Sequence, residues 1–156
     1  MNVASLLTNK RIVCGAQVSS KKRALELVSQ LMADTQDYVK KNEIFDSLVA
    51  RERLGTTGLG HGVALPHGRL ANVPQAMGAL LTLSQGIDFD AVDSEPVDVV
   101  FALVVPQGAT EEHLQLLGQL AEMLRDPSVR ARLREAHTAD DLQTLIGQCQ
   151  PPSPET

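Results

Sequence analysis

A histidine set between a proline and a glycine is the residue of this sequence best suited to chemistry. His67 follows Pro66 and precedes Gly68, at the end of an apolar run that predicts a short strand over residues 63–65. Proline has no N–H and fixes φ, while glycine adds no bulk, so we expect an imidazole that is held in place yet reachable. A neutral imidazole with a pKa near ~6.5 is a good nucleophile at neutral pH. The alternative is a strand-end histidine hydrogen-bonded to a backbone carbonyl.

Glycines are concentrated just before and around this histidine. Five of the 11 glycines in the chain lie between positions 55 and 68, in the segment GTTGLGHGVALPHG. Glycine permits positive φ and a close approach to the backbone, which suits an anion or the surface of another protein. The spacing matches neither a Walker phosphate-binding loop nor a dinucleotide-binding fingerprint, and a plain connecting loop is the alternative.

A second histidine is predicted to begin the buried face of a helix. Thr110 is expected to cap a helix that runs to Leu124, and leucines share the face of His113 four, seven and eleven positions further on. The free N–H groups and the dipole of a helix start favour an anion, so His113 is a candidate partner of a phosphoryl group. A buried histidine with satisfied hydrogen bonds is the alternative.

One arginine is predicted to reach toward the glycine segment. Arg51 lies three positions after Leu48 and seven after Ile44, so its stem should follow the core side of a helix that ends near Arg53. Arginine is the usual fork for phosphoryl oxygens. The alternative is a cation that complements the helix C-terminus, and that role fits Arg53 better.

Other kinds of site lack their motifs. No HExxH or GxSxG sequence occurs, and the acidic run over residues 88–95 lacks the spacing of a calcium-binding loop. Cys14 and Cys149 lie 135 positions apart with no CxxC, so neither a disulfide framework nor a structural zinc site is expected, and a reducing cytoplasm is the default location. We therefore expect no metal and no cofactor.

Composition excludes several functional classes. The chain has 156 residues, of which 43% are hydrophobic, and a net charge of -5, which argues against general nucleic-acid binding. Residues 1–69 hold 10 basic and 6 acidic side chains, whereas residues 70–156 hold 4 and 13. Two faces of different charge could help protein partners to dock. No apolar run approaches the ~18 residues of a membrane span, and no signal peptide is expected at the start.

The hydrophobic pattern alternates between helices and strands, which indicates an α/β (α+β) protein with a mixed sheet. The strand over residues 97–105 is apolar on both faces and should be central. We expect one domain over residues 1–149 and a disordered, proline-rich tail over 150–156. The other expected strands cover 12–13, 63–65 and 77–83, and the expected helices cover 21–34 with Ser20 as cap, 39–53, 110–124, 127–135 and 139–146 with Thr138 as cap.

The segment RERLGTTGLGHGVALPHG, from Arg51 to Gly68, resembles the phosphorylation-site signature of enzyme IIA domains of the mannitol/fructose type in the bacterial phosphoenolpyruvate-dependent phosphotransferase system. It is most similar to the stand-alone, nitrogen-regulatory members of that family. The resemblance extends over about residues 6–146, and Glu112-His113-Leu114 matches a second family element. It implies a three-layer α/β/α domain with a central mixed β-sheet.

The resemblance also implies roles for particular residues. His67 would be the phosphorylated histidine, His113 the second active-site histidine and Arg51 the associated arginine. The backbone of the glycine segment would hold the phosphoryl oxygens, through Thr56, Thr57, Gly58, Gly60 and Gly62. Two positions depart from the family pattern, since His61 stands where an amide residue is expected and Thr56 where serine is frequent.

The function implied is that of a regulatory phosphocarrier. A histidine phosphocarrier protein would donate the phosphoryl group, and regulatory targets of the potassium-transport or sensor-kinase type would read the phosphorylation state. Neither nucleic acid nor a membrane is an expected partner. Three alternatives stay open: a sugar-specific IIA component that passes phosphate to a IIB domain, a binding regulator without phosphoryl transfer, and a small-molecule enzyme using His67 and His113 as acid and base.

Overall fold

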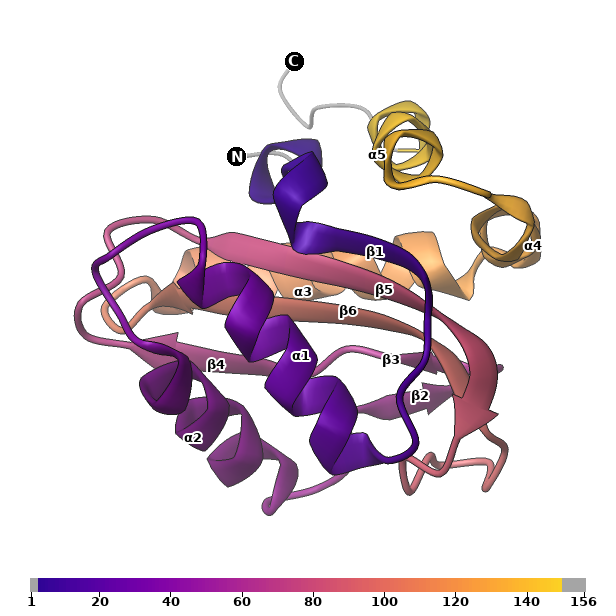
Figure 1. The fold of residues 1–156 in the computed structure, drawn as a ribbon. Coiled ribbons are helices and arrows are strands. Elements are labelled where there is room, and N and C mark those ends of the chain that lie inside the picture. The colour runs from indigo at the N-terminus through magenta and orange to yellow at the C-terminus, as the bar shows by residue number, and fades with distance from the viewer. Residues whose placement is uncertain (1–2, 150–156) are drawn as a thin grey trace.

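The fold is built around one mixed sheet of six strands. The computed structural model describes residues 3–149, so the expected tail over 150–156 lies outside the described residues. Strand order is β1-β5-β6-β3-β2, and β4 also pairs with β6; β2–β3 and β5–β6 are antiparallel and the other pairs parallel (Figure 1). The strands are β1 (Ile12–Ala16), β2 (Gly58–Gly60), β3 (Val63–Ala64), β4 (His67–Leu70), β5 (Met77–Ile87) and β6 (Val97–Pro106).

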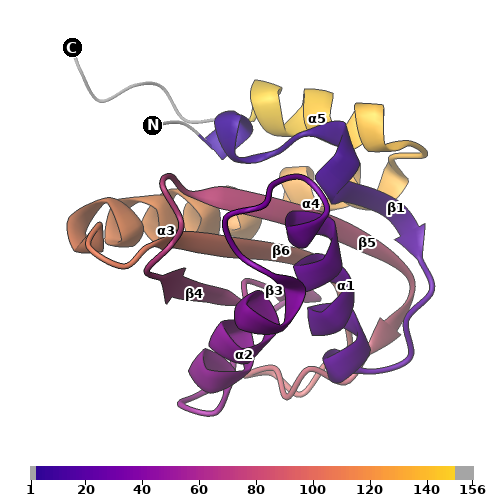
Figure 2. The same cartoon turned by 60° about the vertical axis from the view of Figure 1, so that its left-hand side comes forward.

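Helices cover both faces of the sheet. Two of them, α1 and α2, pack on one face, and α3, α4 and α5 pack on the other (Figures 1 and 2). This arrangement confirms the predicted three-layer α/β/α fold with a mixed sheet. Among residues 3–149, no helix has the length and apolar character needed to cross a membrane. The helices are α1 (Lys21–Ala33), α2 (Lys41–Glu52), α3 (Thr110–Arg125), α4 (Pro127–Glu135) and α5 (Ala139–Gln148), with short 3-10 turns at Val3–Leu6 and Asn9–Arg11.

Strand β6 is central and buried on both faces, as its sequence predicts. Val100, Ala102 and Val104 join the core under α1 and α2. The residues between them, such as Phe101 and Leu103, join the core under α3 and α5. Because successive side chains of a strand point to opposite faces, one apolar strand supplies both cores.

Two of the predicted helix caps are confirmed and one is wrong. The Ser20 hydroxyl accepts from the Arg23 N–H at 3.1 Å, and the Thr138 hydroxyl accepts from the Asp141 N–H at 3.0 Å. Thr110, however, is the first residue of α3 rather than its cap. Ala109 takes the cap position, where its carbonyl accepts the N–H of His113 at 2.9 Å.

The segment around His67 is more strand-like than the sequence predicts. His67 begins β4 instead of ending the preceding strand, and Gly58–Gly60 forms β2 within the expected loop. Strand β6 is long enough to pair with β3 and then with β4. The pairing is interrupted at Pro66, which has no N–H, although its carbonyl still accepts from the Leu103 N–H at 2.9 Å. The chain therefore resumes pairing at His67.

Gly68 allows α2 to pack closely on β4, the strand that carries His67. A Cβ at this position would overlap the Ser47 hydroxyl and lie 3.2 Å from the Ser47 Cβ. Any larger residue would push α2 away from the strand that carries His67.

We expect Gly68→Ala to lower the free energy of unfolding by about 1–3 kcal/mol, because overpacking forces shifts in the neighbouring backbone. Urea unfolding at neutral pH measures the loss. Gly118→Ala is the matched control, since a Cβ there meets nothing within 4 Å, and alanine in an exposed helix should stabilise by about 0.5–1 kcal/mol. A Gly68→Ala protein as stable as the wild type would contradict the packing role.

Candidate functional site

His67 stands at the first residue of β4, opposite Leu103 of the central strand. Its Nδ1 lies 2.9 Å from the carbonyl oxygen of Leu65. A carbonyl can only accept, so the neutral ring carries its proton on Nδ1 and keeps a lone pair on Nε2. The half-buried ring is thus anchored by one nitrogen while the other is free to act as a nucleophile.

His113 lies directly beside His67. The two ring centroids are 5.4 Å apart with an angle of 72° between the ring planes, although 46 positions separate the residues. His113 is only 5% exposed and shares its buried helix face with Leu116 and Leu120. The prediction that the inward face of this helix brings His113 to His67 is confirmed.

Arg69 is a third member of the site, and the sequence did not predict it. Its Nε donates to the Nδ1 of His113 at 3.0 Å. Guanidinium has no acceptor, so Nδ1 must accept and the neutral His113 ring carries its proton on Nε2. That Nε2 is buried and has no hydrogen-bond partner among residues 3–149. A signal for Arg69 was available, because residues two apart on a strand point to the same face, but it required knowing that a strand begins at His67.

Burial keeps both histidines neutral at physiological pH. Desolvation lowers the pKa of His67, and the positive charges of Arg51 and Arg69 lower it further, against a carbonyl hydrogen bond and the Glu52 charge that raise it. Burial also lowers the pKa of His113 to about 4, helped by electrostatic interactions with His67 and with the positive charge of Arg69. Two neutral imidazoles, each with its proton fixed, therefore share the site.

Arg51 reaches the glycine segment as predicted. Its Nη1 donates to the carbonyl oxygen of Gly55 at 2.8 Å, and its charge is near enough to lower the pKa of His67. It therefore also provides the helix-end contact that the sequence favoured for Arg53, which is exposed. The helix-end role and the proximity to His67 coexist in one side chain.

A buried carboxylate fixes the loop after α2 and escaped the sequence analysis. Both oxygens of Glu52 accept from the Thr57 N–H at 3.2 Å, and Glu52 also accepts from the Thr57 hydroxyl. Lys21 pairs with Glu52 at 2.8 Å, and the carboxylate side chain is only 6% exposed. No motif distinguishes Glu52 in the sequence, because its partners come from α1 and from five positions further along the chain.

The glycine segment is a hydrogen-bonded frame in this structure. The N–H groups of Thr57 and Gly58 already have acceptors, in Glu52 and in the Thr56 hydroxyl at 3.0 Å. That hydroxyl in turn donates to the Phe89 carbonyl at 3.0 Å. Gly60 and Gly62 adopt positive φ angles of 100° and 83° in the turn between β2 and β3. Gly60 and Gly62, which the sequence suggested for phosphoryl binding, therefore shape this turn. His67 and Arg69 both contact His113, and we call these three residues the contact cluster.

The family that matches this chain is described as "Phosphoenolpyruvate-dependent sugar phosphotransferase system, EIIA 2", over residues 5–149. The chain belongs to this family. The nitrogen regulatory protein of Pseudomonas aeruginosa is 44% identical over 146 residues, which cover 94% of this chain and 95% of that protein. The resemblance to nitrogen-regulatory IIA proteins is thereby confirmed.

Solved structures agree with this placement. The crystal structure of the nitrogen regulatory protein IIA-Ntr from Neisseria meningitidis superposes with a TM-score of 0.87 at 39% identity, covering 92% of this chain and 98% of that one. The Escherichia coli IIAMTL in its complex with phosphorylated IIBMTL gives a TM-score of 0.76 at 21% identity, covering 91% of this chain and 97% of that one. This second likeness supports the fold.

The lowered pKa of His113 should make the free energy of unfolding depend on pH. The unfolded histidine binds a proton near pH 6.5 and the folded one near pH 4, so the unfolded state binds more protons between these values. Stability should therefore fall as the pH falls from 6.5 to 4, by up to about 3 kcal/mol from this group. His113→Asn removes the titration and keeps an acceptor for Arg69.

Urea unfolding of both proteins at several pH values between 7 and 4 provides the measurement (the range in which His113 titrates in either state). The carboxylates and His67 are common to the two proteins, so the difference curve isolates His113. Parallel curves for wild type and His113→Asn would mean that His113 is not held neutral by the fold.

Proposed function

We propose that this protein is a regulatory phosphocarrier that accepts a phosphoryl group on Nε2 of His67. The donor is a histidine phosphocarrier protein, and the phosphorylation state is read by protein partners. The observation that carries this proposal is the anchoring of His67 by Nδ1 to the Leu65 carbonyl, which leaves Nε2 as the nucleophile. The buried Nε2 of His113, without a partner among residues 3–149, supports it as a donor next to that position.

Transfer needs one bond formed and one broken. The Nε2 lone pair of His67 attacks phosphorus, the P–N bond to the donor imidazole breaks, and its electron pair returns to the donor nitrogen. The proton on Nδ1 of His67 stays in its hydrogen bond to Leu65, which stabilises the positive charge that develops on the ring. No other proton has to move.

The neighbouring side chains stabilise the phosphoryl group by charge and by hydrogen bonding. The Nε2–H of His113 has no acceptor within residues 3–149, and Arg69 fixes the tautomer that places the proton there. Arg69 and Arg51 supply positive charge, while Glu52 is held by Thr57 and Lys21. The phosphoryl charge in turn favours the protonated form of His113, so phosphorylation should raise the pKa of that residue.

The relatives favour a regulatory role over a sugar-specific one. Proteins named nitrogen regulatory protein match nearly the whole chain. We infer that this chain meets its partners through the surface around His67, because a phosphoryl group passes only between residues that come into contact. Targets of the potassium-transport or sensor-kinase type, and a cytoplasmic location with two free thiols, belong to the same proposal.

Labelling of His67 is the first test. After incubation with phosphoenolpyruvate, enzyme I and the phosphocarrier protein, mass spectrometry should find one acid-labile, alkali-stable phosphoryl group on the wild type and none on His67→Ala. His137→Ala is the control, because His137 is exposed and its backbone N–H alone is bonded, to Asp141. Undiminished labelling of His67→Ala would overturn the proposal, and absence of label on the wild type would favour a binding regulator without phosphoryl transfer.

Arg51 should matter more for transfer than for stability. Losing a charged contact to the phosphoryl group should cost about 1.5–3 kcal/mol of transition-state binding, so Arg51→Ala should transfer roughly 10- to 100-fold more slowly. Its helix-end contact to Gly55 is exposed, and the melting temperature should change little. Quenched-flow labelling compares it with Arg53→Ala, the neighbouring exposed arginine. Equal rates of phosphoryl transfer in the two variants would mean that Arg51 acts only as a cation at the end of the helix.

A further inference from the structure

A groove with a volume of about 360 Å³ runs between the β2–β3 turn and the junction of α3 with α4. None of the three residues of the contact cluster, His67, His113 and Arg69, lines it. We call it the junction groove. Its lining residues are Leu59, Gly60, His61, Val63, Ala121, Leu124, Arg125 and Arg130.

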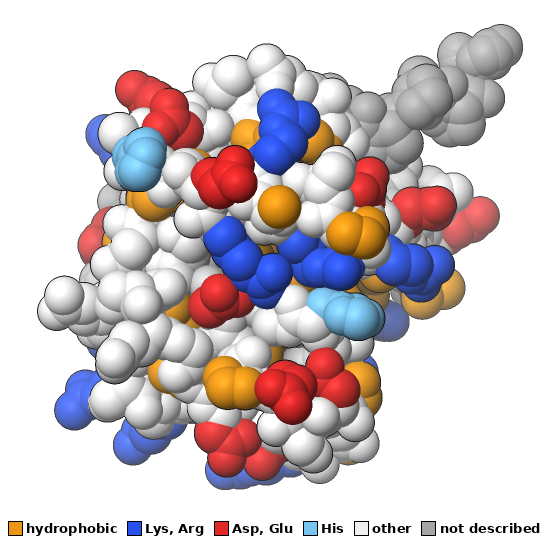
Figure 3. All heavy atoms as spheres, turned by 90° about the vertical axis from the view of Figure 1, so that its right-hand side faces the viewer, with side chains coloured by type: hydrophobic (Ala, Val, Ile, Leu, Met, Phe, Trp, Pro, Cys, Tyr) orange, Lys and Arg blue, Asp and Glu red, His pale blue; other side chains and the backbone are white. Residues whose placement is uncertain are grey.

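Positive charge is concentrated at this groove against the trend of the sequence. Residues 70–156 hold 13 acidic and only four basic side chains, and all four are arginines within positions 125–134. Figure 3 shows basic side chains in a row across this face, with a histidine beside them. Of the four, only Arg134 lies within 4.0 Å of a carboxylate of residues 3–149, that of Asp98 at 2.9 Å. Arg125 and Arg130 therefore bring uncompensated charge to the groove.

His61 is held rigidly at the edge of the groove. Its φ is 58°, between two glycines whose φ angles are also positive, and this conformation is unfavourable for most side chains. The backbone is fixed at both ends, because the His61 N–H donates to Asp93 at 2.9 Å and its carbonyl accepts from Arg134 at 2.6 Å. The turn thus fixes the backbone from which the exposed imidazole projects at the edge of the groove.

The rest of the lining is apolar. Val63 and Leu124 are buried, and Leu59 is 43% exposed and available for contact. Two guanidinium groups and an imidazole around an apolar floor match a ligand with an anionic group and an apolar body. The volume lies in the lower range of sites for small molecules and is small for a folded segment of another protein.

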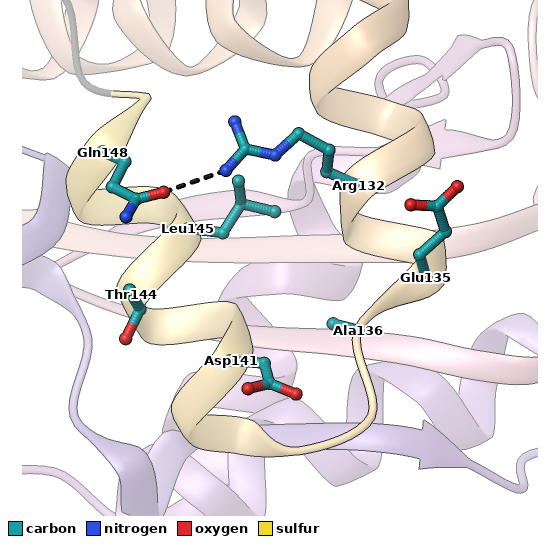
Figure 4. Close-up of a pocket in the computed structure, with 7 residues that line it drawn as sticks. All are labelled: Arg132, Glu135, Ala136, Asp141, Thr144, Leu145 and Gln148. Atoms are coloured by element: carbon teal, nitrogen blue, oxygen red, sulfur yellow. Dashed lines mark hydrogen bonds between the residues drawn. The ribbon is translucent and has the colours of Figure 1, made fainter.

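The hollow between α4 and α5 lacks the excess of positive charge that an anion site needs. It contains Arg132, but also the carboxylates of Glu135 and Asp141 (Figure 4). The Arg132 guanidinium already donates to the side-chain oxygen of Gln148 at 2.9 Å. One arginine and two carboxylates give this hollow a net negative charge, so it does not compete with the junction groove for an anion.

We propose that the junction groove binds a small organic anion, a carboxylate or phosphate attached to a short apolar body. Arg125, Arg130 and His61 bind the anionic group, and Leu59 and Leu124 contact the apolar part. The site does not depend on phosphoryl transfer, since Arg125, Arg130 and His61 have no role in the His67 mechanism.

Phenyl phosphate is the probe, added to the unphosphorylated full-length protein in an amide NMR titration. Saturable shifts should appear at the residues that line the groove. Arg125→Gln should weaken the affinity at least ~10-fold, because a charge-assisted hydrogen bond is lost. Arg125 is chosen because Arg130 also donates to the carbonyls of Leu124 and Arg125 and helps to end α3. Arg53→Gln, a charge-matched change outside the groove lining, should bind as the wild type does.

Four results would overturn the proposal. The first is the absence of saturable shifts, and the second is equal affinity in the wild type and Arg125→Gln. The third is equal affinity for inorganic phosphate and phenyl phosphate, which would leave the apolar floor without a role. Binding of a short acidic, leucine-containing peptide without any binding of phenyl phosphate would also overturn it, in favour of a protein-docking surface. The titration uses the unphosphorylated protein, so its outcome does not depend on whether His67 accepts a phosphoryl group.

Discussion

The hydrogen bond from Nδ1 of His67 to the Leu65 carbonyl is the interaction on which the site depends. It fixes the tautomer, the ring orientation and the free nitrogen in one contact. Regular pairing with β6 stops between these two residues, at Pro66, and resumes at His67 in the same register. Leu65 and His67 therefore lie on the side of the sheet that faces α3, where the His67 ring meets His113.

The surroundings of His67 keep it neutral and hold it still. Burial lowers the pKa of both histidines, so both rings stay unprotonated at physiological pH. Two neutral rings do not repel each other, and each keeps a nitrogen lone pair. Gly68 lets α2 pack tightly on the strand that carries His67, and Glu52 ties the end of α2 to Thr57. The central strand β6, buried on both faces, is the rigid support beneath. Pre-organisation of this kind is what phosphoryl transfer requires of a protein.

The sequence predicted the fold class and the principal histidines because their signals are local and periodic. His113 was placed toward the sheet by leucines at helical spacing, and β6 was identified as central by its two-sided apolar pattern. Arg69 was missed because β4 was not expected, and the break at Pro66 was read as the end of a strand. Glu52 was missed because a buried carboxylate is recognised by its partners. One of these, Lys21, belongs to another helix. Tertiary pairing, which no local pattern carries, accounts for both omissions.

The proton positions on the two rings are the central claim, and nitrogen-15 NMR of the imidazoles tests them most directly. Long-range ¹H–¹⁵N spectra at neutral pH should show His67 protonated at Nδ1 and His113 protonated at Nε2, as their partners Leu65 and Arg69 require. After phosphoryl transfer, coupling to ³¹P should appear at Nε2 of His67. A neutral His67 protonated at Nε2, or phosphorus coupling at Nδ1, would contradict the account.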